Sequence, residues 1–349
     1  MDVTRRELAV LGLGAAATGR LFGAAKPNSK FGGVQVGANV PYIFRGMPGG
    51  ADDILKYCLE PAISLSALEL RSRPVEESLG APAPAGRPGF PGGPPAGGRG
   101  GAAAGGAASG GVPTGAQLSR GMPRLTPEQL AERKAAAEAL RKWRLSQSMN
   151  GFRDFRKKYN DAGVLIQVVK FDGVEAFTDD ELDYAFQLAH ALGAHAISCE
   201  IPVSTTKRMG AFAEKHKLMV GYHGHGNITD PEAFGSLASW ERAMSYSKYN
   251  GANVDIGHFY AANGFSPAKW IQQNHARVTH VHLKDRKANN GPNAPWGEGD
   301  TPIKEILQMM KREKYTFQAT IEMEHAVPAG SSVLAELAKC VQYCRDILA

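Results

Sequence analysis

Residues 253–285 read NVDIGHFYAANGFSPAKWIQQNHARVTHVHLKD, and this stretch contains one complete strand, helix and strand repeat. Short runs of apolar and β-branched residues at 253–256 and 278–283 predict two strands. Between them, the pair Ser266-Pro267 is typical of a helix start and predicts a helix over 267–275. A strand, a helix and a second strand in this order are typical of a parallel sheet, whose strands are joined by crossover helices.

The same alternation continues in both directions from this repeat. Six further strands are predicted, at 34–38, 67–70, 164–169, 196–200, 218–222 and 317–321. Further helices are predicted at 52–59, 127–159, 179–192, 205–216, 231–249, 302–311 and 333–347. Eight strand and helix pairs favour an α/β fold of the closed (β/α)8 TIM-barrel type, and a chain of 349 residues is long enough for one such catalytic domain with attachments. An open, doubly wound parallel sheet is the alternative.

Two segments stand outside the regular pattern of the barrel, which we place at 31–349. Residues 1–25 contain Thr4-Arg5-Arg6-Glu7-Leu8 before a short apolar run, and they resemble a twin-arginine signal peptide, so we expect an exported, periplasmic protein. The apolar run is too short to span a bilayer, and we expect no stable membrane insertion. Residues 80–124 are almost entirely Gly, Ala and Pro, which predicts a disordered surface insertion that interrupts the barrel.

Charge and cysteine content exclude several classes of protein. The net charge of +6 is modest, and we expect no nucleic-acid partner. The four cysteines include only one closely spaced pair, Cys340 and Cys344, and their spacing is not typical of a zinc site or a disulfide framework. A glycine-rich run at 12–17 mimics a dinucleotide-binding loop, but no strand precedes it, so we reject a nucleotide site there.

Polar residues follow the apolar runs at most of the predicted strand ends, where TIM barrels hold their active sites. They are Glu69, Glu200, His223, His225, Asp255, His258, His280, His282, Lys284, Glu322 and Glu324. Imidazole and carboxylate groups together are ligands suited to Mn, Zn, Co or Fe, so the pattern predicts one divalent metal ion. Residues two apart on a strand face the same way, so periodicity alone separates neither His280 from His282 nor Glu322 from Glu324.

Four motifs carry a resemblance to a known family. They are Asp255-Ile256-Gly257-His258, the run His280 to Arg286, the run Pro295 to Ile303, and Ile321-Glu322-Met323-Glu324. These motifs resemble the sugar-phosphate isomerase and epimerase family of xylose isomerase-like TIM barrels, which belongs to one superfamily with endonuclease IV. The resemblance covers the mature chain apart from the insertion, and it implies four metal ligands, with manganese favoured: His223, Asp255, His282 and Glu322.

The resemblance also implies a reaction, with one departure from the family pattern. Many members carry glutamate where this chain has His223, and that glutamate is one of two acid/base residues. A coordinated imidazole offers no free carboxylate, so Glu322 needs a different partner. Candidates from the strand ends are Glu200, His225, His258 and Lys284.

These candidates have alternative interpretations. A carboxylate beside apolar walls could have its pKa raised into the range of a general base, or Glu200 could instead form a salt bridge with a lysine. Lys284 could stabilise an enediolate oxygen or pair with Asp285. We predict Glu322, Glu200 and Lys284 as catalytic residues.

The substrate contacts are predicted from the same strand ends and from one loop. We expect Glu69, His225, His258 and Trp296 to bind the substrate. Trp296 lies in a loop at 286–300 that could close over the ligand, or the ring could anchor the loop to the barrel wall.

The leading hypothesis is a metal-dependent sugar or polyol isomerase or epimerase that abstracts a proton next to a carbonyl, through an enediolate held by the metal. The second is an exported lyase or hydrolase-like enzyme that eliminates a group from a keto-sugar glycoside. The third, from another class, is a non-catalytic exported sugar-binding protein. Endonuclease activity is disfavoured, because the clear ligands number nearer four than a multi-zinc site needs. We expect a small carbohydrate as the partner, and a homo-oligomer is left open.

Overall fold

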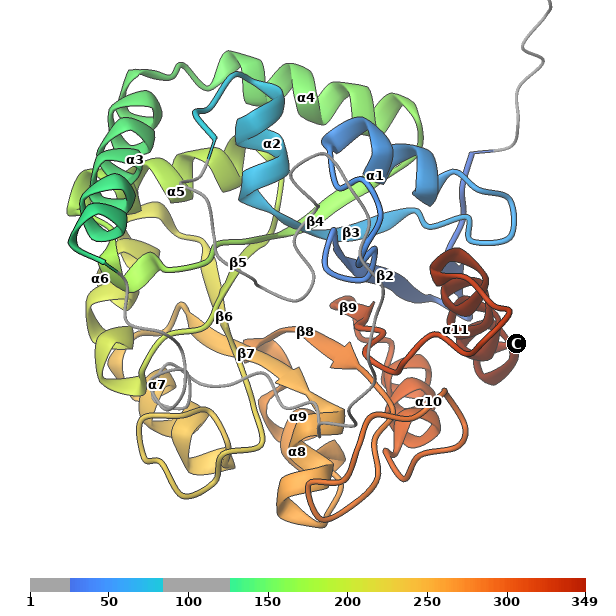
Figure 1. Cartoon of the computed structure of the whole chain (residues 1–349). Coiled ribbons are helices and arrows are strands. Elements are labelled where there is room, and N and C mark those ends of the chain that lie inside the picture. The colour runs from blue at the N-terminus through green and yellow to red at the C-terminus, as the bar shows by residue number, and fades with distance from the viewer. Residues whose placement is uncertain (1–25, 84–125) are drawn as a thin grey trace, which may run out of the picture.

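The computed structural model describes residues 26–83 and 126–349, and its centre is a closed parallel barrel. Strand β2 (Val34–Val40) pairs with the second barrel strand on one side and with the last on the other, which closes the sheet. The other barrel strands follow in sequence order: β3 (Ala67–Arg71), β4 (Leu165–Lys170), β5 (Ala196–Cys199), β6 (Met219–His223), β7 (Asn250–Asp255), β8 (Val278–Leu283) and β9 (Gln318–Ile321). Figure 1 shows these strands around the centre with the helices outside them. The predicted TIM barrel is therefore confirmed, and the open sheet is excluded.

The helices form the outer layer. They are α1 (Ala51–Cys58), α2 (Ser72–Ser78), α3 (Pro127–Ser146), α4 (Asn150–Asp161), α5 (Asp179–Leu192), α6 (Thr206–His216), α7 (Leu237–Tyr246), α8 (Ile256–Asn263), α9 (Ala268–Asn274), α10 (Ile303–Glu313) and α11 (Val333–Leu348). Two of them begin with a complete capping box, in which Thr126 or Thr178 accepts a backbone N–H and the side chain three residues later returns the bond. Such local capping is why these two helix starts could be read from the sequence.

Three elements differ from the sequence prediction. The single helix predicted over 127–159 is wrong, because the backbone is extended at Gln147 and the segment forms α3 and α4. One helix of that length would measure about 50 Å, too long for the flank of a single barrel. The short helices α2 and α8 were not predicted; α8 follows β7 directly and is apolar on most sides, so it lacks a helical period.

The barrel encloses a polar interior. Alternate residues of β7 and β8 point inward, among them Asn253 and His280, whereas Val254 and Val281 belong to the hydrophobic core between strands and helices. Because all these side chains are buried, each polar group in the interior needs a partner from another strand or from a bound ion.

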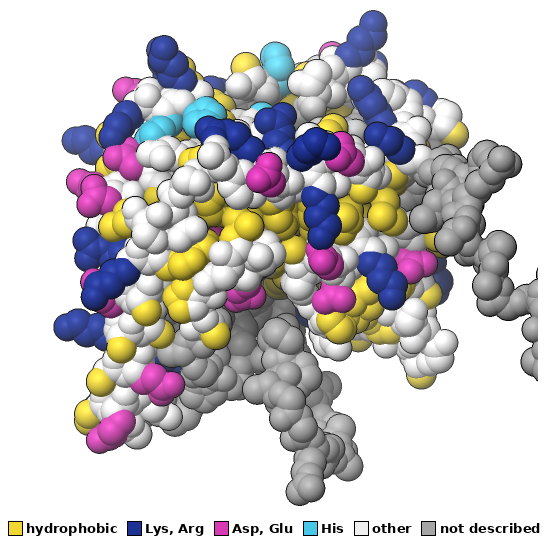
Figure 2. Space-filling view, turned by 90° about the horizontal axis from the view of Figure 1, so that it is seen from above, with side chains coloured by type: hydrophobic (Ala, Val, Ile, Leu, Met, Phe, Trp, Pro, Cys, Tyr) yellow, Lys and Arg dark blue, Asp and Glu magenta, His cyan; other side chains and the backbone are white. Residues whose placement is uncertain are grey.

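The outer surface carries both signs of charge. On the face seen in Figure 2, lysine, arginine and acidic side chains are interspersed around an apolar band, and lysine and arginine predominate along its upper edge. Within residues 26–83 and 126–349, every helix is too short or too polar to cross a membrane. The export signal predicted at 1–25 lies outside the described residues, as does all of the insertion predicted at 80–124 except its first four positions.

Candidate metal centre

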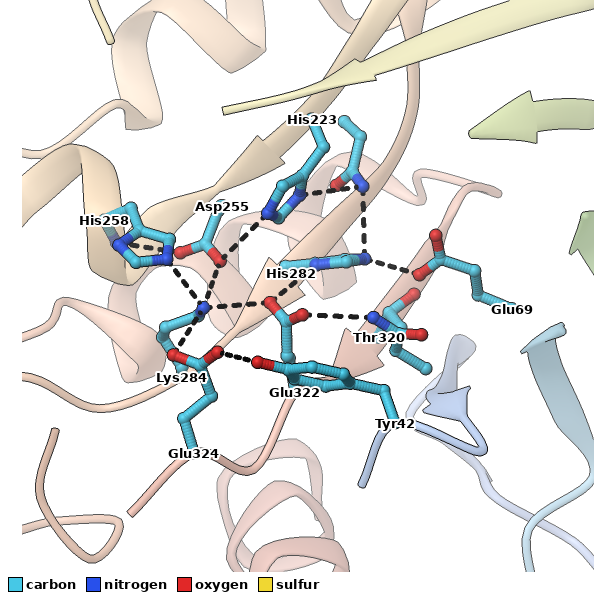
Figure 3. A network of polar contacts seen from close by, with 12 residues as sticks. Tyr42, Glu69, His223, Asp255, His258, His282, Lys284, Thr320, Glu322 and Glu324 are labelled. Atoms are coloured by element: carbon cyan, nitrogen blue, oxygen red, sulfur yellow. Dashed lines mark hydrogen bonds and ion pairs between the residues drawn. The ribbon is translucent and has the colours of Figure 1, made fainter. Parts of the chain in front are cut away.

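Four donor side chains meet at the carboxyl ends of four consecutive strands. His223 ends β6, Asp255 ends β7, His282 lies near the end of β8, and Glu322 follows β9 directly. One donor atom from each lies within 4.8 Å of all the others, and all four residues are buried. Figure 3 shows the four side chains converging. The structure thus brings together the four residues expected to be ligands, and they form a candidate metal site.

The Glu322 carboxylate is held from several sides. Asn39 donates to Oε1 over 3.0 Å, and Nδ1 of His282 lies 2.8 Å from Oε2. Burial would raise the pKa of Glu322, but Lys284 and His282 hold it well below its ordinary value. Burial would lower the pKa of His282, but the carboxylates of Glu69 and Glu322 raise it to about 10. A cation that binds here therefore displaces the imidazole proton that faces Glu322.

The other two donors suit a divalent cation as well. Burial, reinforced by the neighbouring His282, holds the pKa of His223 well below its ordinary value, so its imidazole is neutral, as metal binding requires. Oδ1 of Asp255 accepts the backbone N–H of His258 at 2.8 Å, and the buried Oδ2 lies 2.9 Å from Nζ of Lys284. Burial raises the pKa of Asp255 to about 6, although Lys284 opposes that shift. Two imidazoles and two buried carboxylates fit a divalent transition metal.

Lys284 is a buried ammonium at the edge of this site. Its Nζ lies 2.9 Å from carboxylate oxygens of Asp255, Glu322 and Glu324. Burial would lower the pKa of Lys284, but these carboxylates raise it well above its ordinary value. Lys284 is therefore a cation that donates hydrogen bonds, and its predicted pairing with Asp285 is not the contact observed.

Glu200 and His225 form a pair at the rim of the barrel. Oε1 of Glu200 lies 2.5 Å from Nζ of the buried Lys170, and Oε2 lies 3.1 Å from Nε2 of His225. Burial would raise the pKa of Glu200, but Lys170 and then His225 lower it well below its ordinary value. The expectation that this pKa is raised is therefore wrong, and the salt bridge with a lysine is observed instead. Glu200 remains a carboxylate that orients His225.

His258 lies between two cations. Nζ of Lys284 is 2.9 Å from Nε2 of His258, and the guanidinium of Arg286 contacts Nδ1. Burial and Lys284 hold the pKa of His258 well below its ordinary value. His223, His225 and His258 also lie close enough together to share a cation, but the charges of Lys284 and Arg286 oppose one there.

Glu69 and Trp296 were expected to bind the substrate, and in the structure both contact other side chains of the protein. Glu69 is fully buried in the barrel, and its Oε2 lies 2.5 Å from Nε2 of His282. Trp296 packs edge to face against Tyr343 of α11, with ring centroids 5.8 Å apart, in the outer layer. Its loop is fixed by Asp285, whose carboxylate accepts backbone N–H groups of Gly297 at 2.8 Å and of two later residues. The observed contact is the loop anchor rather than a closing lid.

Several polar residues of the site were missed from the sequence. Asn253 lies between the rings of His223 and His282, with Nδ2 3.2 and 3.1 Å from their nitrogens. Tyr42 donates its hydroxyl to Glu324 at 2.5 Å. Asn253 could have been predicted from the sequence, because residues two apart on a strand point to the same side and Asn253 precedes Asp255 by two residues. Tyr42 follows the end of β2, where the sequence has no histidine or carboxylate, so no motif indicated that it belongs to the site.

Comparisons with known proteins agree with this architecture. Residues 102–343 match a family model described as the xylose isomerase-like TIM barrel. No curated protein has a significantly matching sequence. A xylose isomerase domain protein from Alicyclobacillus acidocaldarius superposes with a TM-score of 0.56 at 14% identity, over 90% of this chain and 99% of that one.

Two further solved structures are similar in fold. The probable 3-DHS dehydratase AsbF from Bacillus anthracis gives a TM-score of 0.53 at 12% identity, over 88% of this chain and 98% of its own. The IOLI protein, solved with a bound zinc atom, gives 0.52 at 11% identity, over 90% and 98% of the two chains. At such identities the similarity to these structures shows a shared fold.

Proposed function

Since the chain belongs to the xylose isomerase-like TIM barrel family, we propose that it is a divalent-metal-dependent isomerase or epimerase of a sugar or polyol. The observation that carries this proposal is the buried cluster of His223, Asp255, His282 and Glu322, with Lys284 beside two of its carboxylates. A divalent cation there would polarise a carbonyl group and stabilise negative charge on its oxygen. The donor set suits manganese, zinc, cobalt or iron, and the two carboxylates favour manganese.

His225 is the residue best placed to move the proton. Its Nε2 contacts Glu200, and this contact leaves Nδ1 for the substrate. In the proposed step the imidazole takes a proton from the carbon beside the carbonyl, and the C–H electron pair shifts to form an enediolate. Lys284 donates a hydrogen bond to the oxygen that becomes negative. Return of the proton to the former carbonyl carbon, with transfer of the hydroxyl proton of the first carbon to the new alkoxide, gives an isomer. Delivery of a proton from water to the opposite face of the first carbon gives an epimer.

Elimination from a keto-sugar glycoside is the second candidate, and the unlike chemistry of His225 and Lys284 favours it. An epimerase with two equivalent acid/base groups is symmetric, whereas here one group is an imidazole and the other an ammonium. In elimination, His225 takes the proton, a carbon–carbon double bond forms, and the bond to the leaving oxygen breaks as that oxygen gains a proton. Similarity in fold to a probable dehydratase is compatible with this outcome. Export through the signal at 1–25 remains part of the proposal and is supported by its sequence alone.

The test combines metal analysis with proton exchange. Purified full-length protein is analysed for metal, then incubated in deuterium oxide with sugars and 3-keto-glycosides while products are followed by NMR. We expect one divalent metal per chain and deuterium uptake beside the carbonyl; formation of an isomer or epimer identifies the leading function, and release of an aglycone identifies elimination. Tight sugar binding without any exchange would identify a binding protein instead.

Two variants and one control make the assignment specific. We expect His225→Gln to keep its metal and to lose about 10²- to 10⁴-fold in turnover, the usual contribution of a general base. Glu322→Gln should lose metal and activity together. His275→Gln, on an exposed histidine outside the site, is the control and should behave like the unmodified protein. Full turnover in Glu322→Gln, or a protein that binds no metal, would end the proposal.

A further inference from the structure

We propose that Glu69 is the positioning residue of this centre: its carboxylate fixes which nitrogen of His282 faces the cation and, through Asn253, does the same for His223. The inference rests on the metal centre proposed above and adds the residue that organises it. Glu69 lies on β3, on the far side of His282 from Glu322, so Figure 3 shows the His282 ring between two carboxylates.

The contacts of Glu69 assign the proton on His282. Oε2 of Glu69 lies 2.5 Å from Nε2 of His282, and both side chains are completely buried. Two atoms with lone pairs would repel each other at that distance, so Nε2 carries the proton and donates it to the carboxylate. Nδ1, which faces Glu322 at 2.8 Å, is then the nitrogen free to bind a cation. A carboxylate that orients a metal-binding histidine in this way also raises its basicity.

Asn253 extends this assignment to His223. Its amide group lies 3.1 Å from Nε2 of His282 and 3.2 Å from Nδ1 of His223. Because Nε2 of His282 already carries a proton, the group that faces it must be an acceptor. Turning the Asn253 amide by 180° places Oδ1 there, an oxygen that otherwise has no hydrogen-bond partner. Oδ1 can then accept Nδ1–H of His223, which leaves Nε2 of His223, 4.0 Å from Oδ2 of Asp255, free for the cation.

A cation bound directly by Glu69 is the competing interpretation. Glu69, His280 and His282 lie close enough to share one, and Oε1 of Glu69 and Nε2 of His280 lie 3.4 Å apart without a hydrogen bond. Such an ion would need the lone pair of Nε2 of His282, which the contact with Oε2 of Glu69 assigns to a proton. The geometry therefore favours Glu69 as a positioning residue, and a second metal becomes a measurable alternative.

The test measures metal affinity in three variants of the full chain. Titration with manganese should show a 10- to 100-fold weaker Kd for Glu69→Met, which removes the acceptor. Glu69→Gln keeps an acceptor oxygen and should recover part of the affinity. His280→Gln, which changes the other neighbour of Glu69 but no proposed ligand, is the matched control and should stay within about threefold of the unmodified protein. The absorption spectrum of bound cobalt should change in Glu69→Met and not in His280→Gln.

A measurement on the unmodified protein keeps the inference testable even where a variant does not fold. NMR of the zinc-loaded protein with ¹⁵N-labelled histidine should show His282 bound through Nδ1 and protonated at Nε2. Zinc on Nε2, equal manganese affinity in Glu69→Met, or two metals per chain with one lost in that variant would each overturn the role of Glu69. A protein that binds no metal would overturn the proposed function as well, which separates the two failures.

Discussion

Replacement of Lys284 by methionine tests how the charges of the site are balanced. The ammonium is 1% exposed and lies 2.9 Å from oxygens of Asp255, Glu322 and Glu324. Methionine has a similar length but no charge, so the variant buries three carboxylates without their shared cation. Breaking a buried ion pair in this way costs about 3–5 kcal/mol, and we expect a loss of this size for Lys284→Met without metal.

Metal should reverse most of this loss. A divalent cation between Asp255 and Glu322 supplies positive charge to the same carboxylates, so the variant gains more from binding it than the unmodified protein does. Each 1.4 kcal/mol corresponds to a tenfold change in affinity, and recovery of about 3–5 kcal/mol predicts manganese binding about 10²- to 4 × 10³-fold tighter in Lys284→Met. Turnover should nevertheless fall by about 10²- to 10³-fold, because the donor to the developing oxyanion is missing.

The assay is urea unfolding with and without manganese, together with calorimetric titration of the metal. Lys304→Met, which removes an exposed lysine on α10, is the control and should change neither quantity. An equal loss of stability with and without manganese, or weaker manganese binding in Lys284→Met, would show that Lys284 and the cation do not neutralise the same carboxylates.

Three further predictions concern the scaffold and are checked by denaturation. Gly257→Ala should destabilise the protein by about 1–3 kcal/mol and lower its activity, because a Cβ there would lie 2.4 Å from Cγ of Lys284; full activity with unchanged stability would contradict it. Arg144→Met should cost about 3–5 kcal/mol, since it leaves the fully buried Glu76 without the guanidinium that lies 2.7 Å away; a neutral effect would show that the pair is replaceable. Hydrogen bonds lower the pKa of the Glu336 carboxyl from its ordinary 4.5 to about 2, and the one from Lys339 has the largest effect. The stability that this carboxylate gives the fold is therefore complete above pH 4.5 and is lost as the pH falls towards 2. Glu336→Gln should therefore cost about 1–2 kcal/mol at pH 7 and almost nothing near pH 2, and a difference independent of pH would refute the assignment.

The barrel could be predicted because its signals are local. Apolar runs followed by capped helices repeat along the chain, and each can be recognised within about ten residues. The errors arose where a local pattern is ambiguous: a helical pattern over 127–159 does not show where packing against the barrel ends one helix and begins another. The insertion and the signal peptide were read from composition, and that reading stays a prediction.

The candidate ligands could also be predicted, because they follow the apolar runs of four strands and the barrel topology brings those strand ends together. The two-residue period of a strand could not distinguish His282 from His280 or Glu322 from Glu324. The resemblance to a family selected His282 and Glu322 as ligands. The sequence left open whether Glu200 has a raised pKa or forms a salt bridge, because its partner Lys170 is 30 residues away on another strand. No local pattern indicates which lysine faces a given carboxylate.

The sequence by itself determined the type of fold and the kinds of side chain at the carboxyl ends of the barrel strands. Both can be read from short stretches of consecutive residues, because strand and helix periods are local patterns. Only the tertiary structure decided the charge state and partner of each group. It places Glu69 beneath His282, 213 residues apart in the chain, and Lys284 among three carboxylates from β7 and the segment after β9. These contacts form only when the barrel closes and brings the side chains of β3 and β8 together in its interior. The pKa of each group depends on its burial and on its distance from neighbouring charges, and the folded structure sets both.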